Sequence, residues 1–305
     1  MCQFLTCYWQ IDLMLIETTI ILPIYVFLLF DISICHFRKT HFQSQYYSLV
    51  ISQAIADICT ALCVIYLYVA RYLHFGNNLL FNSQIYGSGI FISEFGPIFF
   101  IIRFFGIFLM TFQRYQTVCS KKSITYNINN LSFCKIFLIH FLVPFLIYIP
   151  CFSTIPGDLP FFNNSDELSV INSGFRIKFF SMTVIVVFIF FGTLDLFMYI
   201  SIIYSIWKTK KVFNVSRKNK DFYQEIRLLI HILLLVCTST LTFLYYLNEF
   251  LGSAINSNSD NRKDVRRYYA IIAVNFGYIN PIILIFLNRD VKMRAKKFWV
   301  RSSTF

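Results

Sequence analysis

The sequence contains few charged residues. Aspartate, glutamate, lysine and arginine make up only 14% of its 305 residues, whereas hydrophobic residues make up 57%. A typical soluble domain has roughly 25% charged and about 45–50% apolar residues. The composition therefore argues against a water-soluble fold. It also argues against a nucleic-acid-binding protein, which would carry its basic residues on a polar surface.

The sequence also lacks the short motifs of enzymes and metal sites. It has no Gly-x-Ser-x-Gly elbow, no phosphate-binding loop and no His-Glu-x-x-His motif, and its five histidines are scattered. Nine cysteines, spread mostly through apolar stretches, do not describe a disulfide framework. Cys59 and Cys63 lie one helical turn apart, and packing is favoured over metal binding because no second half of a site is recognisable. We expect no catalysis, cofactor or metal.

Long apolar runs are the dominant feature of the chain. A helix needs roughly 20 predominantly apolar residues to cross the hydrocarbon core of a bilayer. Seven runs meet this length, at residues 13–35, 48–71, 90–112, 134–154, 179–207, 226–250 and 268–287. They predict an all-α membrane protein with a seven-helix bundle over residues 13–287, a short N-terminus at 1–12 and a tail at 288–305.

Basic residues are distributed unevenly between the two sides of this predicted bundle. Of the 27 lysines and arginines, 19 fall in the segments on one side, 7 fall on the other side and Arg103 falls inside the third run. Basic residues are retained on the cytoplasmic side during insertion. The distribution predicts a multi-pass plasma-membrane protein with an extracellular N-terminus and a cytoplasmic C-terminus, whose first run serves as the insertion signal. The basic segments are expected to contact acidic membrane lipids.

Three charged residues fall deep within the predicted spans. By helical rise, Asp57, Arg103 and Asp195 each lie about 15–18 Å from the inner surface. A charge at this depth costs about 2.5–3.5 kcal/mol on insertion scales, so it requires a partner or a function. The three residues predict a buried polar cluster. Arg103 either forms a structural ion pair with one of the acids or serves as a counter-charge for a ligand, and both hold if a ligand competes for the pair.

Acidic residues also occur near the outer ends of the spans. Glu17, Glu94 and Glu249 fall in the first, third and sixth spans, respectively. Above an aromatic-rich interior they predict an outward-opening pocket for a small ligand. The alternative is that they lie at the water boundary and mark the helix ends. For the pocket, the residues expected to contact the ligand are Glu94, Arg103, Asp195 and Glu249.

Three short motifs occur in order at matching depths. The second span contains the run Leu49–Asp57, the third closes on Phe112–Tyr115 with the sequence FQRY, and the seventh closes on Asn280–Leu284 with the sequence NPIIL. With these motifs the chain resembles the rhodopsin-like G-protein-coupled receptors over nearly its whole length. The resemblance implies a rhodopsin-like seven-transmembrane fold. Residues 288–299 resemble the short amphipathic eighth helix of such receptors.

The resemblance also implies roles for individual residues. Arg114 and Tyr115 would contact a heterotrimeric G protein at the inner face, with Arg114 restrained while the receptor rests. Asp57 and Asn280 would face each other inside the bundle as part of an activation switch. Pro281 would let the seventh helix bend, because proline removes one helix hydrogen bond.

Several features depart from the rhodopsin-like pattern. Gln113 stands where an acidic residue usually precedes the arginine, so the restraint on Arg114 would be weaker or made elsewhere. The fifth and sixth spans contain no proline, the sixth lacks the tryptophan–proline pair, and no cysteines are placed for the usual outer disulfide. With these absences and its Phe- and Tyr-rich helices, the chain is more similar to the nematode serpentine chemoreceptors, particularly classes gamma and v. This similarity implies chemosensory signalling through a heterotrimeric G protein in response to a small molecule.

The sequence therefore predicts a chemosensory receptor, with two alternatives. One is a channel or transporter that uses the buried charged cluster as its path, and the other is a seven-helix accessory protein without signalling activity. Asn163 lies in an Asn-Asn-Ser sequon on a predicted outer loop and is expected to be glycosylated. The sequons at Asn130 and Asn214 fall on predicted inner loops and are expected to stay unmodified.

Overall fold

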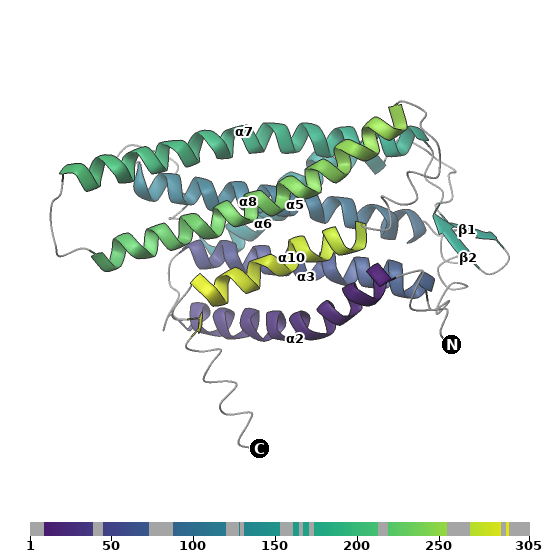
Figure 1. Cartoon of the computed structure of the whole chain (residues 1–305), viewed down its shortest axis with the longest axis horizontal. Coiled ribbons are helices and arrows are strands. Elements are labelled where there is room, and N and C mark those ends of the chain that lie inside the picture. Colours follow the sequence, from purple (N-terminus) through teal and green to yellow (C-terminus); the bar gives the residue numbers. More distant parts are fainter. Residues whose placement is uncertain are drawn as a thin grey trace, which may run out of the picture.

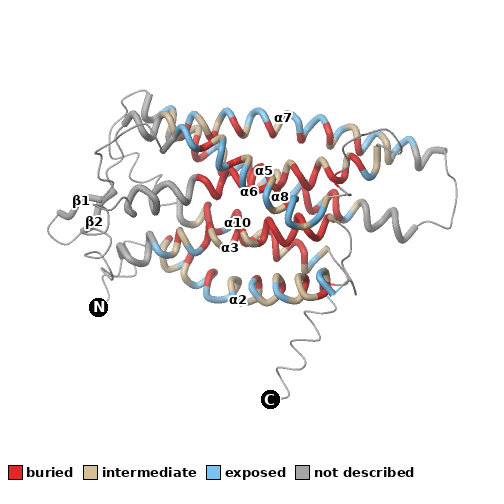
Figure 2. Tube along the Cα trace, turned by 180° about the vertical axis from the view of Figure 1, so that it is seen from behind, coloured by how far each residue is buried: buried red, intermediate tan, exposed pale blue. Residues whose placement is uncertain are grey.

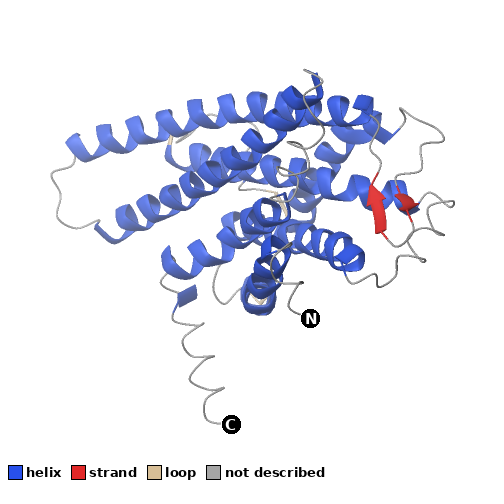
Figure 3. Cartoon of the chain, turned by 45° about the vertical axis from the view of Figure 1, so that its right-hand side comes forward, coloured by secondary structure: helices blue, strands red, loops and turns tan. Residues whose placement is uncertain are grey.

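A computed structural model describes most of the chain as helices. The described residues are 9–38, 45–72, 88–119, 128, 131–152, 161–164, 167–170, 174–212, 219–254, 269–287 and 291–292. They form seven helices and one β-hairpin (Figure 3). The elements are α2 (Trp9–Phe37), α3 (Gln45–Tyr72), α5 (Ser88–Val118), α6 (Phe133–Phe152), β1 (Phe161–Asn164), β2 (Glu167–Val170), α7 (Gly174–Val212), α8 (Asn219–Ala254) and α10 (Tyr269–Leu287).

Each of the seven predicted spans coincides with one helix, so the seven-helix fold is confirmed. Six helices are long and apolar enough to cross a membrane, and α10 carries the shorter apolar segment Ile271–Leu287. The largest difference from the predicted spans is the length of α7 and α8, which have 39 and 36 residues. At about 1.5 Å per residue, both exceed the roughly 30 Å of the hydrocarbon core.

Part of the extra length of α7 and α8 lies at one end of the bundle, where α7 continues five residues past its predicted span and α8 begins seven residues before its own. There both helices continue past α2 and α10, on the left in Figure 1. At this end α5 finishes at Val118, α3 begins at Gln45 and α10 finishes at Leu287. Arg114 lies in the last turns of α5, and we call this end of the bundle the Arg114 end.

Helix α5 is the central helix of the bundle. It packs against α3, α6, α7 and α8. In its span 78% of the residues are buried, against 22% in the spans of α2 and α6. Buried residues accordingly concentrate on α5 and α3, while the outer helices expose one side (Figure 2). On α7 the exposed side carries large apolar side chains such as Phe197 and Trp207, which a bilayer would cover.

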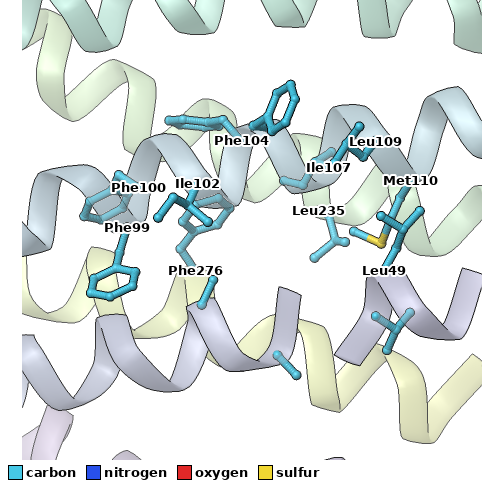
Figure 4. Packing of buried hydrophobic residues seen from close by; sticks show 14 of the residues in the cluster. Leu49, Phe99, Phe100, Ile102, Phe104, Ile107, Leu109, Met110, Leu235 and Phe276 are labelled. Carbon is cyan, nitrogen blue, oxygen red and sulfur yellow. The ribbon is translucent and has the colours of Figure 1, made fainter. Parts of the chain in front are cut away.

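Aromatic rings fill much of the core. Phe100 and Phe104 of α5 both pack against Phe276 of α10, with ring centroids 6.0 and 5.6 Å apart (Figure 4). Toward the Arg114 end, Leu49 of α3 and Met110 of α5 are both buried in the same hydrophobic core. The phenylalanines of the core therefore pack neighbouring helices against one another.

The β-hairpin is an element that the sequence did not predict. Strands β1 and β2 are antiparallel, with Phe161 opposite Val170 and Asn164 opposite Glu167. Two residues, Ser165 and Asp166, separate the strands in the sequence. The hairpin lies at the end of the bundle opposite the Arg114 end (Figure 1).

The predicted amphipathic helix at 288–299 lies outside the described residues, apart from Val291 and Lys292. Val291 is buried in the hydrophobic core. Val291 therefore packs against the bundle, and the division into an N-terminus at 1–12 and a tail at 288–305 stays a prediction.

Candidate functional site

An ion pair between α3 and α5 lies at the centre of the bundle. The Nε atom of Arg103 on α5 is 2.7 Å from Oδ1 of Asp57 on α3, and the two side chains are 0% and 1% exposed. Both residues lie near the middle of their helices. The predicted pairing of Arg103 with an acid is therefore present, and Asp57 is that acid.

Asp57 also receives hydrogen bonds from α2, α10 and its own helix. The Tyr25 hydroxyl donates to Oδ2 at 2.6 Å, and the Asn280 amide donates to the same oxygen at 3.0 Å. The Gln53 amide donates to Oδ1 at 3.3 Å. Oδ2 thus has two hydrogen-bond donors, and Oδ1 has the Gln53 amide and the Arg103 cation beside it. This is the surrounding that an ionised carboxylate requires, because it can only accept.

The guanidinium of Arg103 is enclosed by aromatic rings and backbone. Its Cζ atom lies 3.7 Å from the centroid of the Phe276 ring and 5.7 Å from that of Phe100, so both rings interact with the cation. Its Nη1 donates to the carbonyl of Ala273 at 3.3 Å. Gly277 leaves room for this side chain, since a Cβ there would lie 3.3 Å from Nη2. The charge of Arg103 is thus compensated within the protein.

A chain of hydrogen bonds continues from Asp57 toward the Arg114 end. Asn280 Oδ1 is 3.0 Å from Nε2 of His231 on α8, and the other ring nitrogen of His231 is 2.6 Å from the Tyr46 hydroxyl on α3. The Asn280 oxygen can only accept, so a neutral His231 carries its proton on Nε2. Tyr46 then donates to Nδ1. All the bonds of the chain consequently run in one direction, toward Asp57.

The chain ends at Arg114. The Cζ atom of Arg114 lies 4.3 Å from the centroid of the Tyr46 ring, a distance at which a cation and a ring attract each other. Arg114 is 6% exposed, so its guanidinium is covered. The neighbouring Gln113 donates to Thr117 on the same helix at 3.3 Å. A continuous set of polar contacts thus connects the buried ion pair to Arg114.

Comparison with known families identifies the bundle. The family model described as serpentine type 7TM GPCR chemoreceptor Srv matches residues 14–300, nearly the whole chain. The chain belongs to this family. No curated protein matches the sequence. The prediction of a nematode serpentine chemoreceptor is confirmed, and membership of this family indicates a multi-pass membrane receptor rather than an enzyme.

Asp195 lies apart from the ion pair of this chemoreceptor. Its carboxyl group is buried on α7, beside Thr111 of α5. Thr111 is eight residues from Arg103, or about 12 Å along the helix toward the Arg114 end. The expectation that Asp57, Arg103 and Asp195 form one cluster is therefore wrong. The depth of Asp195 was predicted by counting residues from the end of its span. That count was misleading, because α7 continues past the other helices and its end does not mark the membrane surface.

The structure describes only some of the other residues that the sequence predicts to be functional. Pro281 is buried on α10, directly after Asn280, and Tyr115 is half-buried beside Arg114 on α5. Their roles in switching and coupling stay predictions. Three predicted side chains lie outside the described residues, namely those of Glu94, Asn163 and Glu249.

Possible metal ligands were also compared with the structure. Among the described residues, no group of three or more His, Cys, Asp or Glu side chains is placed to hold a metal ion. Cys59 and Cys63, one turn apart on α3, are both free and half-buried. Both pack against the hydrophobic core, as small apolar side chains would.

Four residues that take part in the hydrogen bonds between Asp57 and Arg114 were not predicted from the sequence. They are Tyr25, Tyr46, Gln53 and His231. Each carries a hydrogen-bonding group inside an apolar helix, where an unpaired polar group is costly. A signal existed for His231, which lies five residues inside the predicted span 226–250. Ionisable residues within membrane spans are rare and are functional candidates by default. Its partners could not be identified, because they come from distant helices.

Proposed function

We propose that this chemoreceptor binds a small extracellular ligand in the half of the bundle away from the Arg114 end and activates a heterotrimeric G protein at the Arg114 end. The polar chain from Arg103 and Asp57 through Asn280 and His231 to Arg114 is the observation that carries the proposal. Coupling between distant sites travels through such contiguous contacts when they have two discrete arrangements. A ligand that shifts the ion pair would thereby change the surroundings of Arg114.

Aromatic rings support a largely apolar ligand. On the side of the ion pair away from the Arg114 end, Tyr246 of α8 packs against Phe100 and Phe180, with ring centroids 5.6 and 5.3 Å apart. Tyr148 of α6 extends this cluster to Phe180 at 5.9 Å. Because Asp57 already neutralises Arg103, this region presents little net charge. A small apolar or aromatic molecule matches such surroundings.

Polar contacts of the ligand are proposed at three residues. Arg103 would form the floor of the ligand site, and Glu94 and Glu249, near the outer helix ends, would accept hydrogen bonds from a donor group on the ligand. Asp195 was expected to join them. Because it lies beside Thr111, on the Arg114 side of the ion pair, we place it outside the ligand site.

The Arg114 end has the features that a G protein would contact. Helices α7 and α8 extend past the other helices there, and both carry exposed basic residues, such as Lys208 and Arg227. Arg114 and Tyr115 would contact the G protein once the end opens. The surrounding basic residues would also bind acidic lipid headgroups.

The excess of basic residues at the Arg114 end supports a cytoplasmic location for that end, in the plasma membrane. Asn163 in β1 is then extracellular, whereas Asn130 and Asn214 are cytoplasmic. We expect endoglycosidase treatment to increase the gel mobility of the wild-type receptor and to leave Asn163→Gln unchanged. Asn130→Gln and Asn214→Gln serve as controls and should behave as the wild type. A glycan on Asn130 or Asn214 would reverse the proposed orientation.

The channel or transporter alternative is not favoured by the observed geometry. It depended on a cluster of Asp57, Arg103 and Asp195, and Asp195 lies beside Thr111 instead. Arg103 is fully buried among aromatic rings. Neither residue therefore marks a polar path across the membrane.

A compound screen tests the proposed function. Cells expressing the receptor and a G-protein reporter would be exposed to volatile and water-soluble small molecules. We expect at least one apolar or aromatic compound to give a saturable, receptor-dependent signal. Compound-gated current or uptake in membranes that lack G proteins, without any reporter response, would contradict the proposal and favour the channel alternative.

A further inference from the structure

We propose that the hydrogen bond between Tyr46 and His231 holds the Arg114 end closed and so sets the ligand-independent activity of the receptor. His231 is then a positioning residue, which acts on Arg114 through Tyr46. The inference rests on the proposed function, because it concerns the regulation of the same G-protein site.

The position of the bond supports this role. It joins the beginning of α3 to α8, and the two side chains are 0% and 1% exposed, with 2.6 Å between the hydroxyl and Nδ1. The same Tyr46 ring lies against the guanidinium of Arg114. The hydroxyl therefore fixes the ring, and the ring covers the cation. Release of the hydroxyl frees the ring to move away from Arg114.

The residue next to Arg114 is an amide and not an acid. Gln113 is uncharged, and its amide donates to Thr117 on the same helix. Arg114 also has an aromatic contact with the Tyr46 ring, which the sequence did not predict. A neutral hydrogen bond has a net value of about 0.5–1.5 kcal/mol, so breaking it changes an equilibrium by roughly two- to tenfold.

Because α8 is long, its attachment at His231 controls the position of its end. Twelve residues of α8, from Asn219, precede His231 and extend about 18 Å along the helix toward the Arg114 end. A small rotation about the middle of α8 therefore moves its end over a large distance. Tyr199 of α7 also holds α8, through a 3.2 Å hydrogen bond to the Leu229 carbonyl, but this contact allows α7 and α8 to move together. The Tyr46–His231 bond opposes such a movement because it ties α8 to α3.

A second buried histidine provides a matched control. His140 of α6 has Nδ1 at 2.6 Å from the Ser52 hydroxyl of α3 and Nε2 at 2.9 Å from the Ile102 carbonyl of α5. Ser52 thus makes the same kind of bond, from the same helix and with the same length, as Tyr46. The Ser52–His140 bond does not involve α8. Removing the Ser52 hydroxyl therefore tests for a general loosening of the bundle.

The experiment compares Tyr46→Phe with Ser52→Ala. Both remove one hydroxyl, and Tyr46→Phe keeps the ring that lies against Arg114. Ligand-independent G-protein signalling would be measured per receptor at the cell surface. We expect a roughly two- to tenfold increase for Tyr46→Phe and no change for Ser52→Ala. Equal increases in both variants, or none in a folded Tyr46→Phe, would overturn the proposal.

His231→Phe provides a second test and covers a failure of Tyr46→Phe to fold. It removes the acceptor of the same bond, together with the hydrogen bond that His231 donates to Asn280, while keeping a ring of similar size. We expect it to raise ligand-independent signalling as well. If both single variants act through one bond, ligand-independent signalling by the double variant should be no higher than that of the more active single variant. Additive increases would contradict the proposal.

A distance measurement separates this proposal from the proposed function. Probes at the exposed residues Lys135 of α6 and Arg227 of α8 would report the separation of the two helices in the purified receptor. We expect the distance distribution to shift to longer values in Tyr46→Phe and to stay unchanged in Ser52→Ala. A shift without any G-protein response, even in the wild type, would support the bond's role and refute the proposed function. An unchanged distribution would overturn the bond's role.

Discussion

Replacing Asp57 with asparagine is expected to remove most of the folded receptor. The variant keeps the shape of the side chain but leaves the charge of Arg103 buried without its anionic partner. Breaking a buried pair in this way costs about 3–5 kcal/mol, because the remaining charge is neither solvated nor paired. Total stabilities of folded proteins are only about 5–15 kcal/mol. We expect a strong loss of surface expression and a much lower thermal midpoint for the small amount that folds.

Two further variants test whether the pair causes this loss. Asp195→Asn makes the same chemical change at a buried carboxyl group outside the ion pair, and it should fold nearly as the wild type. The double variant Asp57→Asn with Arg103→Gln removes both charges, and it should give more folded receptor than Asp57→Asn alone. The account fails if Asp57→Asn folds normally or if the double variant brings no recovery.

Gly106→Ala is expected to destabilise the junction of three helices. A Cβ at this position of α5 would overlap both Gln53 Oε1 of α3 and His140 Nε2 of α6. To make room, Gln53 would have to leave Asp57, and His140 would have to leave the Ile102 carbonyl. Overpacking of this kind costs about 1–3 kcal/mol, which exceeds the gain of up to about 1 kcal/mol from alanine in a helix. Thermal unfolding of the purified receptor would show a lower midpoint.

Gly192→Ala is the matched control for this change. Gly192 also lies within a long helix, α7, but a Cβ there would lie 3.7 Å from the Phe188 ring, an ordinary contact distance. We expect the midpoint of Gly192→Ala to be unchanged or slightly raised. If Gly106→Ala raises the midpoint as well, the close approach of α5 to α3 and α6 is not a constraint on stability.

The helices of this receptor could be predicted because the membrane fixes their length. Every run of about 20 apolar residues became a helix, since only a helix satisfies its own backbone hydrogen bonds in lipid. The outer hairpin could not be found by the same rule, because its four-residue strands cross no membrane. The ends of α7 and α8 were also missed, because no long apolar run marks them in the sequence.

The site was predictable only in part. The cost of burying Arg103 indicated an acid or a ligand as its partner, and the motifs placed Asp57 opposite Asn280; the structure shows the pair with Asp57 and the contact with Asn280. The choice of Asp57 over Asp195 depends on how the helices are rotated and shifted against one another. The same holds for the partners of His231, which lie 185 residues before it and 49 residues after it. Such contacts are set by packing and leave no local signal in the sequence.

Nucleotide exchange by a purified heterotrimeric G protein would test the central claim most directly. The wild-type receptor and Arg114→Ala would be reconstituted in bilayers and compared with and without an activating compound. The account predicts compound-dependent exchange by the wild type and a loss of at least about tenfold in Arg114→Ala, equivalent to about 1.4 kcal/mol of coupling, with compound binding retained. Equal exchange by both proteins would contradict the role of Arg114. Compound binding by the wild type without exchange on any G protein would contradict the proposed function itself.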